Sequence, residues 1–402
     1  MAVPLQRWVL VGTAAIALAT NGVLTACASP AVTPAGTSIA QASVAPSQLR
    51  TANPTQAPTP TATATPAPTP TPEPTPAPVP APLTGRLVAP EVAQRHPIAV
   101  MIDDLGPARP QSGFNSAAVV WHAPAEGGIP RYMMVFQDQI PGAVGPVRSS
   151  RYYYIAWAAE WKALYAHAGG SPQALKTLRA KGAGQLVYNA DEFRWAGYFR
   201  RVRDRYAPHN LYTAGKTLRK LAAKIGADDG PMKPVWQFAP DAPLAQRPKG
   251  GTIQVAYPAN TIKYSYDRKS NTYLRGVTRE AKQIDAATGK RVAPKNVIVM
   301  IMQFGPLNDG HPNKKRLEAD VVGKGKAWIA TNGHTIAGTW RKKSLTAPTL
   351  FYDADGKPVT LTVGQTFVQV LKQGSKVIIK DGKVPPPVPL QHIGRGVSGM
   401  AN

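Results

Sequence analysis

The feature that most constrains this fold is a tract near the N-terminus, residues 28–84, built almost entirely from Pro, Thr, Ala and Ser with very little charge. Its last part alternates Thr-Pro and Ala-Pro between residues 57 and 82. Such a composition buries too little apolar surface to fold, and its prolines keep the backbone extended. At ~3.1 Å per residue the tract would reach roughly 100 to 150 Å. We therefore expect a tether, with the folded part of the chain after it.

The segment before this tether predicts an export signal. Arg7 precedes an apolar run at residues 8–20 that is too short for a comfortable membrane span. Leu-Thr-Ala-Cys follows at residues 24–27 and resembles the bacterial lipobox, whose cysteine thiol takes a diacylglycerol. Cys27 is the only cysteine, so the chain can form no internal disulfide. We predict a lipoprotein signal peptide at 1–26, and acylated Cys27 with the disordered tether at 27–85. The alternative is an ordinary secretory signal with a chance cysteine.

The charge balance points to anionic partners. The chain has 47 Lys and Arg against 22 Asp and Glu, a formal net charge of +25. Nucleic acid is the usual first partner for such a balance, but both alternatives for the signal place the mature chain outside the cytoplasm. We therefore expect an extracytoplasmic protein held at the cell membrane by the lipid on Cys27. Its expected ligand is an anionic envelope polymer or a polyprenyl phosphate, with no nucleic acid, cofactor or metal. The oligomeric state is left open.

The rest of the chain predicts an α+β protein in two parts. Residues 86–227 alternate apolar runs of strand length with helical segments, which favours an α/β N-terminal domain. Strands are expected at 98–102, 117–121, 132–136 and 163–167, and helices at 152–162, from 172 onward, at 191–203 and at 213–225. Residues 228–251 are rich in Pro, Ala and Gly and predict a linker. Short alternating runs separated by Asn-Gly and Asp-Gly turns predict a mainly β C-terminal domain at 252–384, before a flexible tail at 385–402.

One stretch, residues 126–151, combines an acid with three arginines beside Gly and Pro residues. Arg131, Arg148 and Arg151 are candidates for binding an oxyanion, because a guanidinium offers a planar fork of donors that matches phosphate or carboxylate. Glu126 is either their counter-ion or a base, and we favour the counter-ion. The alternative is that these arginines are simply solvated on the surface.

A second anion feature follows at Gly169, Gly170 and Ser171, where Ser171 is the expected cap of a helix that starts with Pro172. The free N–H groups and partial positive charge of a helix start attract anions, and the glycines would let a ligand approach the backbone. A plain helix cap is the competing interpretation. His167, just upstream, could titrate near neutral pH or donate to a ligand, although a lone histidine is more often structural.

Further polar residues could contribute to the same site. Arg201 and Arg203 lie in a basic run that leads into His209, and they would face the same way only in an extended segment. Such a run is usually a solvated surface. Asp103 and Asp104 follow the first expected strand, where open α/β sheets place ligands. They could act on a metal or as a base, whereas a turn-forming pair is the plainer interpretation.

Several of these motifs together resemble the YerB-like lipoproteins, a bacterial family with two adjacent domains of unknown function. The matching segments are residues 109–113, 126–128, 145–149, 167–172, 208–212, 296–299 and 338–340. They cover nearly all of the chain after the tether. The resemblance implies a lipoprotein with two domains, and it implies no activity.

The order of motifs in the first domain is also similar to that of the LytR-CpsA-Psr phosphotransferases, which move anionic glycopolymers from a polyprenyl pyrophosphate carrier to the cell wall. This resemblance implies phosphate-binding roles for Arg131, Arg148, Arg201 and Arg203. It also implies an acid at Asp103 or Asp104. In that family acids follow the first two arginines, whereas this chain has Tyr132 and Ser149 there. Their loss would weaken Mg²⁺ binding, so binding is a better expectation than catalysis.

The sequence therefore predicts a lipoprotein that binds a phosphorylated or otherwise anionic envelope ligand. The predicted site consists of Glu126, Arg131, Arg148, Arg151, His167, Gly169, Gly170, Ser171, Arg201, Arg203 and His209. Two alternatives stay open: a glycopolymer phosphotransferase, and a non-catalytic protein-interaction module of the envelope.

Overall fold

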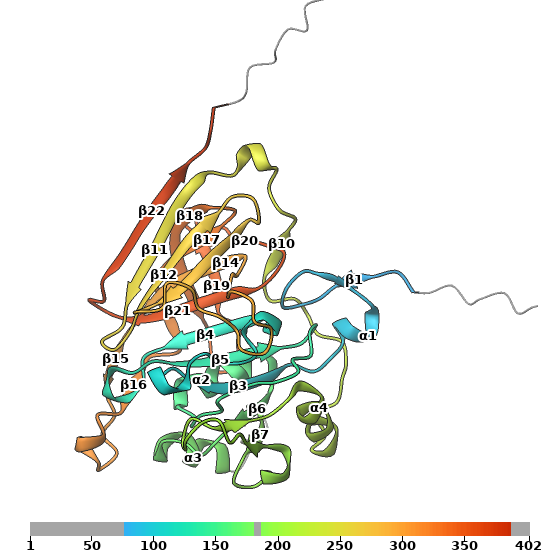
Figure 1. Cartoon of the computed structure of the whole chain (residues 1–402), viewed down its shortest axis with the longest axis vertical. Coiled ribbons are helices and arrows are strands. Elements are labelled where there is room, and N and C mark those ends of the chain that lie inside the picture. The colour runs from blue at the N-terminus through green and yellow to red at the C-terminus, as the bar shows by residue number, and fades with distance from the viewer. Residues whose placement is uncertain (1–75, 181–185, 387–402) are drawn as a thin grey trace, which may run out of the picture. The chain divides into compact units, whose positions relative to one another are not determined.

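The computed structural model describes residues 76–180 and 186–386 (Figure 1). The signal peptide, Cys27 and the tether up to residue 75 lie outside the described residues, as does the predicted tail from residue 387. The described part is a mixed α/β structure made mostly of strands with few helices. None of its helices combines the length and the apolarity that a membrane crossing requires.

A ten-stranded sheet is the centre of the fold, and it takes five strands from each half of the chain. Its order is β19-β18-β17-β14-β21-β4-β5-β3-β6-β7. The strands from the first half are β3 (Ile98–Asp103), β4 (Val119–Ala123), β5 (Arg131–Phe136), β6 (Leu164–His167) and β7 (Tyr188–Asp191). Those from the second half are β14 (Asn296–Met302), β17 (Gly323–Thr331), β18 (His334–Lys342), β19 (Leu350–Asp353) and β21 (Thr366–Lys372).

The two halves join where β21 pairs in parallel with β4, with Thr366 opposite Val119. This pairing crosses the predicted domain boundary, so the halves share one sheet. The boundaries at 228 and 251 themselves stay a prediction. Strands β3, β4 and β21 are buried over most of their length, which explains their continuous apolar sequences.

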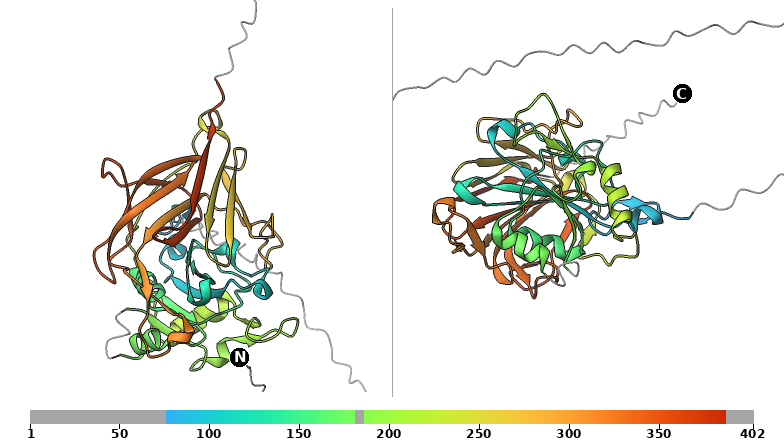
Figure 2. Two further views of the ribbon diagram at one scale, coloured as in Figure 1. Left: turned by 90° about the vertical axis from the view of Figure 1, so that its left-hand side faces the viewer. Right: turned by 90° about the horizontal axis from the view of Figure 1, so that it is seen from below.

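A second, four-stranded sheet of order β13-β12-β11-β22 lies over one face of the large sheet (Figure 2). Its strands are β11 (Lys249–Ala256), β12 (Thr261–Asp267), β13 (Thr272–Val277) and β22 (Val377–Lys383). Burial alternates along β12, with Ile262, Tyr264 and Tyr266 facing inward. These side chains join a hydrophobic cluster with Val297 and Phe367 of the large sheet. Burying one face of each sheet in this way holds the two sheets together.

Helices cover the first half of the large sheet on both faces. Helices α2 (Tyr152–Ala158) and α3 (Pro172–Arg179) pack with one hydrophobic cluster, and α4 (Gly215–Lys224) packs with the other. Helix α3 starts as predicted, because Ser171 Oγ accepts a hydrogen bond from the backbone N–H of Ala174 and Pro172 takes the first helical position. A short helix, α1 (Pro90–Ala93), precedes β3.

Short two-stranded pairings connect the remaining segments. These pair β1 (Val79–Pro80) with β2 (Leu87–Val88), β8 (Arg200–Arg201) with β9 (Leu211–Tyr212), β10 (Gln237–Ala239) with β20 (Thr360–Thr362), and β15 (Phe304–Pro306) with β16 (Leu317–Ala319). Because β10 pairs with β20 and Trp236 is buried, the predicted linker at 228–251 packs against the body over part of its length.

Two sequence-based expectations need correction. The predicted helix at 191–203 is wrong: the segment contains the end of β7, a turn, a single 3-10 turn at Ala196–Tyr198 and β8. The Asp191 carboxylate accepts hydrogen bonds from the backbone N–H groups of Gly169 and Phe193, which fixes a turn where the helix was expected. The predicted C-terminal end of the tether, at residue 85, also lies too far along the chain. Leu83 and Thr84 are buried, and the Thr84 hydroxyl donates to Asp138 at 2.9 Å.

Candidate functional site

A partly exposed group of the predicted polar residues lies at the end of β3. The carboxylate of Asp103 contacts His209 Nδ1 at 2.8 Å and lies 3.2 Å from Arg148 Nε. We call Asp103, Arg148 and His209 the open triad. The side chains of Arg148 and His209 are 24% and 15% exposed, whereas that of Asp103 is 2% exposed. Solvent therefore reaches Arg148 and His209, whereas Asp103 contacts both from a buried position.

Backbone pairing brings these three residues together. The backbone N–H of Arg148 donates to Met101 O at 2.9 Å, so residues 146–148 run beside the end of β3. Val147 N–H donates to Leu211 O, which draws the segment with His209 alongside. Gly145 permits this close approach, because a Cβ atom there would lie 2.6 Å from the ring of Tyr212. The motifs at 145–149 and 208–212 thus have a structural role in positioning the open triad.

Glu126, Arg131 and Arg151 form a second group, which we call the closed triad. Arg131 Nη2 donates to Glu126 Oε1 at 2.8 Å, and Arg151 Nε donates to Glu126 Oε2 at 2.6 Å. Arg131 Nη1 also donates to Ser149 O at 2.7 Å. The arginine side chains are only 9% and 6% exposed, so their donors are used inside the protein. Glu126 is therefore the counter-ion of both arginines.

Arg148 differs from Arg131 and Arg151 in how its donors are used. Its Nε is buried and, within the described residues, has no hydrogen-bond partner, although Asp103 lies within ion-pair distance. Burial lowers the pKa of the Arg148 guanidinium and the Asp103 charge opposes this effect. Since arginine starts from so high a pKa, the group stays charged at neutral pH. Because Nε is buried beside Asp103, an acceptor from outside could reach only the outer, solvent-facing part of this guanidinium.

The predicted helix-start site is largely occupied by the protein itself. Gly169 N–H donates to Asp191, Ser171 N–H donates to Ser150 O, and Ala174 N–H donates to the Ser171 hydroxyl. His167 is buried, with Nδ1 2.8 Å from Gly169 O and Nε2 2.8 Å from Asn189 Oδ1. Burial lowers its pKa, although the Asp191 charge opposes the shift. These contacts fit a structural role for His167 and for the backbone of Gly169 and Ser171. The pairing of Ser150 with Gly170 holds the start of the helix beside the segment that contains Arg148 and Arg151.

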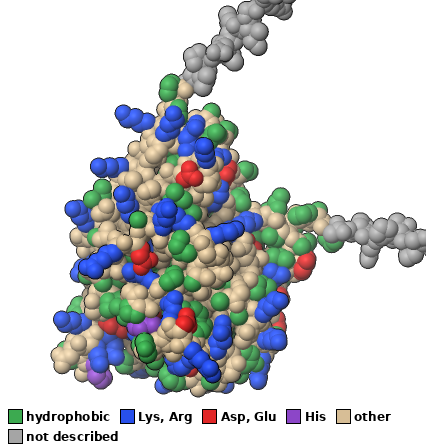
Figure 3. Space-filling view, in the orientation of Figure 1, with side chains coloured by type: hydrophobic (Ala, Val, Ile, Leu, Met, Phe, Trp, Pro, Cys, Tyr) green, Lys and Arg blue, Asp and Glu red, His purple; other side chains and the backbone are tan. Residues whose placement is uncertain are grey.

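Arg201 and Arg203 lie toward solvent on the extended segment that contains β8. The Arg201 side chain is 51% exposed, lies 3.6 Å from Glu192 and donates to Asn210 at 3.1 Å. Arg203 is exposed. Asn210 follows His209 directly, so Arg201 lies at the rim of the open triad. In the space-filling view of Figure 3, Lys and Arg are spread over the whole visible face.

Sequence reasoning missed a buried polar network that joins the two halves of the chain. Asp104 Oδ2 lies 3.0 Å from His122 Nε2 and accepts a hydrogen bond from Asn260 Nδ2 at 2.7 Å. Burial would raise the pKa of Asp104, but the His122 contact and the charge of Arg109 outweigh it, so the pKa is lowered. Arg275 is also fully buried and donates to the hydroxyl of Tyr264. The sequence marked Asp104 only as the end of a strand, and no local pattern marks His122, Asn260 or Arg275, because their partners come from distant segments. In residues 76–180 and 186–386, no group of three or more His, Cys, Asp or Glu side chains could hold a metal ion.

Comparison with known proteins gives consistent matches over the folded part. Residues 83–228 match the N-terminal domain, and residues 253–368 the C-terminal domain, of a family described as "protein of unknown function (DUF3048)". The chain is 29% identical over 313 residues to the "putative lipoprotein YerB" of Bacillus subtilis, covering 75% of this chain and 88% of the relative. The crystal structure of the YerB protein from Bacillus subtilis matches with a TM-score of 0.65 at 27% identity, covering 74% of this chain and 99% of that one.

Proposed function

Because the chain belongs to the DUF3048 family and is a distant homologue of a protein named as a lipoprotein, we propose that it is an extracytoplasmic lipoprotein, anchored through Cys27, that binds an anionic envelope ligand at the open triad. The lipobox-like residues before Cys27 and the long tether support the anchor. Replacing Cys27 with Ser should release the protein from the membrane fraction, and retention there would contradict the anchor.

The observation that carries the binding proposal is the Arg148 side chain, which is 24% exposed while its buried Nε lies 3.2 Å from Asp103. Charge-assisted hydrogen bonds from arginine to phosphate or carboxylate are short and strong, and a guanidinium can form two of them to one anion. The two triads together contain three arginines against two carboxylates, Glu126 and Asp103, so the surroundings favour an anion. Arg201 and Arg203 add positive charge at the rim. The predicted ligand contacts therefore narrow to Arg148, His209 and these rim arginines.

The test is calorimetric titration of the full chain in detergent. The probes are farnesyl pyrophosphate, as a short polyprenyl pyrophosphate, and poly(glycerol phosphate), as a phosphate polymer. Arg148→Ala should weaken binding by about tenfold or more, the equivalent of ~1.4 kcal/mol. Arg279→Ala removes one exposed arginine elsewhere and is the matched control. Unchanged affinity in Arg148→Ala would remove the proposed site, and no binding by the unaltered protein would favour a protein-interaction module.

Phosphoryl transfer is a second candidate, supported by the orientation of His209. If His209 Nδ1–H donates to Asp103, the other ring nitrogen, Nε2, carries the lone pair and can accept a proton from an attacking hydroxyl. Arg148 would stabilise the charge of the transferring group. Magnesium in such reactions is commonly held by one or two carboxylates together with the substrate's phosphates.

His209→Asn separates this activity from binding, because the Asn amide can still donate to Asp103 but cannot act as a base. Release of phosphate from farnesyl pyrophosphate, or transfer of a glycopolymer, would be measured with Mg²⁺ present. If His209 is the base, turnover should fall by about 100-fold or more, a larger loss than the loss of affinity expected because His209 is also a predicted ligand contact. If the unaltered protein shows neither release nor transfer, the binding function alone is left.

A further inference from the structure

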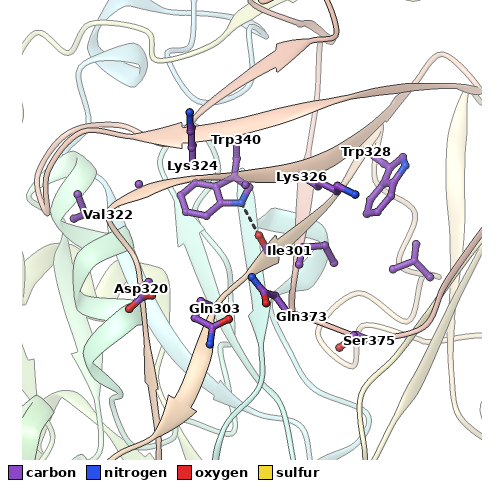
Figure 4. Close-up of a pocket in the computed structure, with 14 residues that line it drawn as sticks. Ile301, Gln303, Asp320, Val322, Lys324, Lys326, Trp328, Trp340, Gln373 and Ser375 are labelled. Atoms are coloured by element: carbon purple, nitrogen blue, oxygen red, sulfur yellow. Dashed lines mark hydrogen bonds between the residues drawn. The ribbon is translucent and has the colours of Figure 1, made fainter.

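A polar pocket of about 740 Å³ lies in the second half of the chain, lined by residues that belong to neither triad (Figure 4). One wall is the start of β17, with Lys324, Lys326 and Trp328. The others are the segment after β14, with Gln303, and the turn between β21 and β22, with Gln373. The volume is within the range of about 300 to 1,000 Å³ that is typical of small-ligand sites.

The pocket is built on a fixed base. Trp340 is 2% exposed, and its indole Nε1–H donates to Ile301 O at 2.7 Å, the contact drawn in Figure 4. Gly325, paired with Trp340 across the hairpin, makes this placement possible. A Cβ atom at Gly325 would lie 2.5 Å from the indole nitrogen and 2.6 Å from Ile301 O. The indole thus lies where the pairing of β14 with β17 ends, at Met300 and Ala327, and closes the pocket there.

The lining has the chemistry of a saccharide site. Trp328 is partly exposed, two residues after Lys326 on the same side of β17. Its indole can pack against the C–H face of a sugar ring, because aromatic faces carry partial negative charge. Gln303 and Gln373 are exposed at the pocket and can each donate and accept hydrogen bonds, as sugar hydroxyl and amide groups require.

The charge of the lining selects among saccharides. Lys324 and Lys326 are both exposed, whereas Asp320 is the one acid among the lining residues. Lys372 and Lys376, also exposed, flank Gln373 in the chain. A flexible lysine ammonium suits a carboxylate that hangs from a sugar ring, since it can reach the group without a fixed fork geometry.

We propose that this pocket binds a short oligosaccharide that carries a carboxylate. Trp328 stacks on one ring, Gln303 and Gln373 hydrogen-bond to its edge, and Lys324 and Lys326 pair with the acid. The inference is independent of the open triad. Either site can fail its test without affecting the other.

A matched pair of disaccharides provides the test, again by titration of the full chain in detergent. The acidic probe is N-acetylglucosaminyl-N-acetylmuramic acid, whose lactyl group bears a carboxylate, and the neutral probe is chitobiose. We expect saturable binding of the acidic probe and at least about tenfold weaker binding of chitobiose. Trp328→Ala should weaken binding of both probes about tenfold or more. The double change Lys324→Met and Lys326→Met should reduce the preference for the acidic probe to about twofold or less.

Two controls distinguish site loss from unfolding. Tyr206→Ala removes an aromatic side chain that is 91% exposed and lies outside the pocket, and it should leave both affinities unchanged. Thermal melting of each variant checks the fold, and Gln373→Ala gives a second, exposed pocket change in case Trp328→Ala is unstable. The site would be overturned if the unaltered protein showed no saturable binding. It would also be overturned if Trp328→Ala and Gln373→Ala both bound the acidic probe as tightly as the unaltered protein does. Equal affinity for both disaccharides would overturn its acidic selectivity.

Discussion

The open and closed triads both pair arginine with a carboxylate near the ends of the neighbouring strands β3 and β5, but their environments differ. Asp103 and Arg131 are even paired across β3 and β5. In the closed triad two nearly buried arginines share Glu126, so their donors are spent within the protein. In the open triad the Arg148 side chain is 24% exposed, so the outer part of its guanidinium faces solvent while its buried Nε lies beside Asp103. An arginine cluster therefore stabilises the fold or offers a binding site according to how its donors are used.

The largest effect is expected from breaking the closed triad. Glu126→Ala would leave Arg131 and Arg151 unpaired where their side chains are nearly buried. Removing one partner of a buried ion pair costs about 3 kcal/mol or more, because the remaining charge is desolvated without compensation. We expect the free energy of unfolding, measured with urea, to fall by ~3 kcal/mol. Glu280→Ala, whose carboxylate lies 3.8 Å from Arg109 and is 39% exposed, should cost less than ~1 kcal/mol. Similar stability in the two variants would remove the distinction between the triads.

The buried histidines His167 and His122 should also make the stability of the fold depend on pH. Burial lowers the pKa values of His167 and His122 in the folded state below the ordinary 6.5. As pH falls below 6.5, the unfolded chain takes up protons that the folded chain does not, so stability is present above this pH and is lost on acidification. His167→Gln should reduce the slope of unfolding free energy between pH 6.5 and 5 by up to ~1.4 kcal/mol per pH unit. The control is His334→Gln, an exposed histidine. If His167→Gln left the pH dependence of the unfolding free energy unchanged, His167 would not be a histidine whose pKa is lowered by folding.

The smallest effects are expected at the rim. Arg201 is 51% exposed, so its attraction for an anion acts through solvent and is screened by salt. We expect Arg201→Ala and Arg203→Ala each to weaken farnesyl pyrophosphate binding by about threefold or less at low salt. In ~0.5 M salt the difference from the unaltered protein should vanish, because the screening length is then only a few ångströms. A loss at Arg201 equal to that at Arg148 would place the centre of binding at the rim instead.

The sequence was informative where structure depends on local pattern. The apolar runs of β3, β5 and β6 and the Ser171 cap were predictable, because burial and capping follow from the residue types themselves. The turn after Asp191 was not, since it depends on a hydrogen bond from Gly169, a residue distant in the sequence. For the same reason, the sequence identified three candidate arginines but could not distinguish Arg148 from Arg131 and Arg151, which form ion pairs with Glu126.

The most direct test of the account is the ligand-induced thermal shift of Arg148→Ala, measured with farnesyl pyrophosphate. A ligand that binds only the folded state stabilises it by about 2.7 kcal/mol at 100 times its Kd. The account predicts that the unaltered protein shifts upward in Tm. It also predicts that Arg148→Ala starts from nearly the same Tm and does not shift. A variant that melts much earlier without ligand, yet still shifts on adding it, would mean that Arg148 supports the fold and that the anion binds elsewhere.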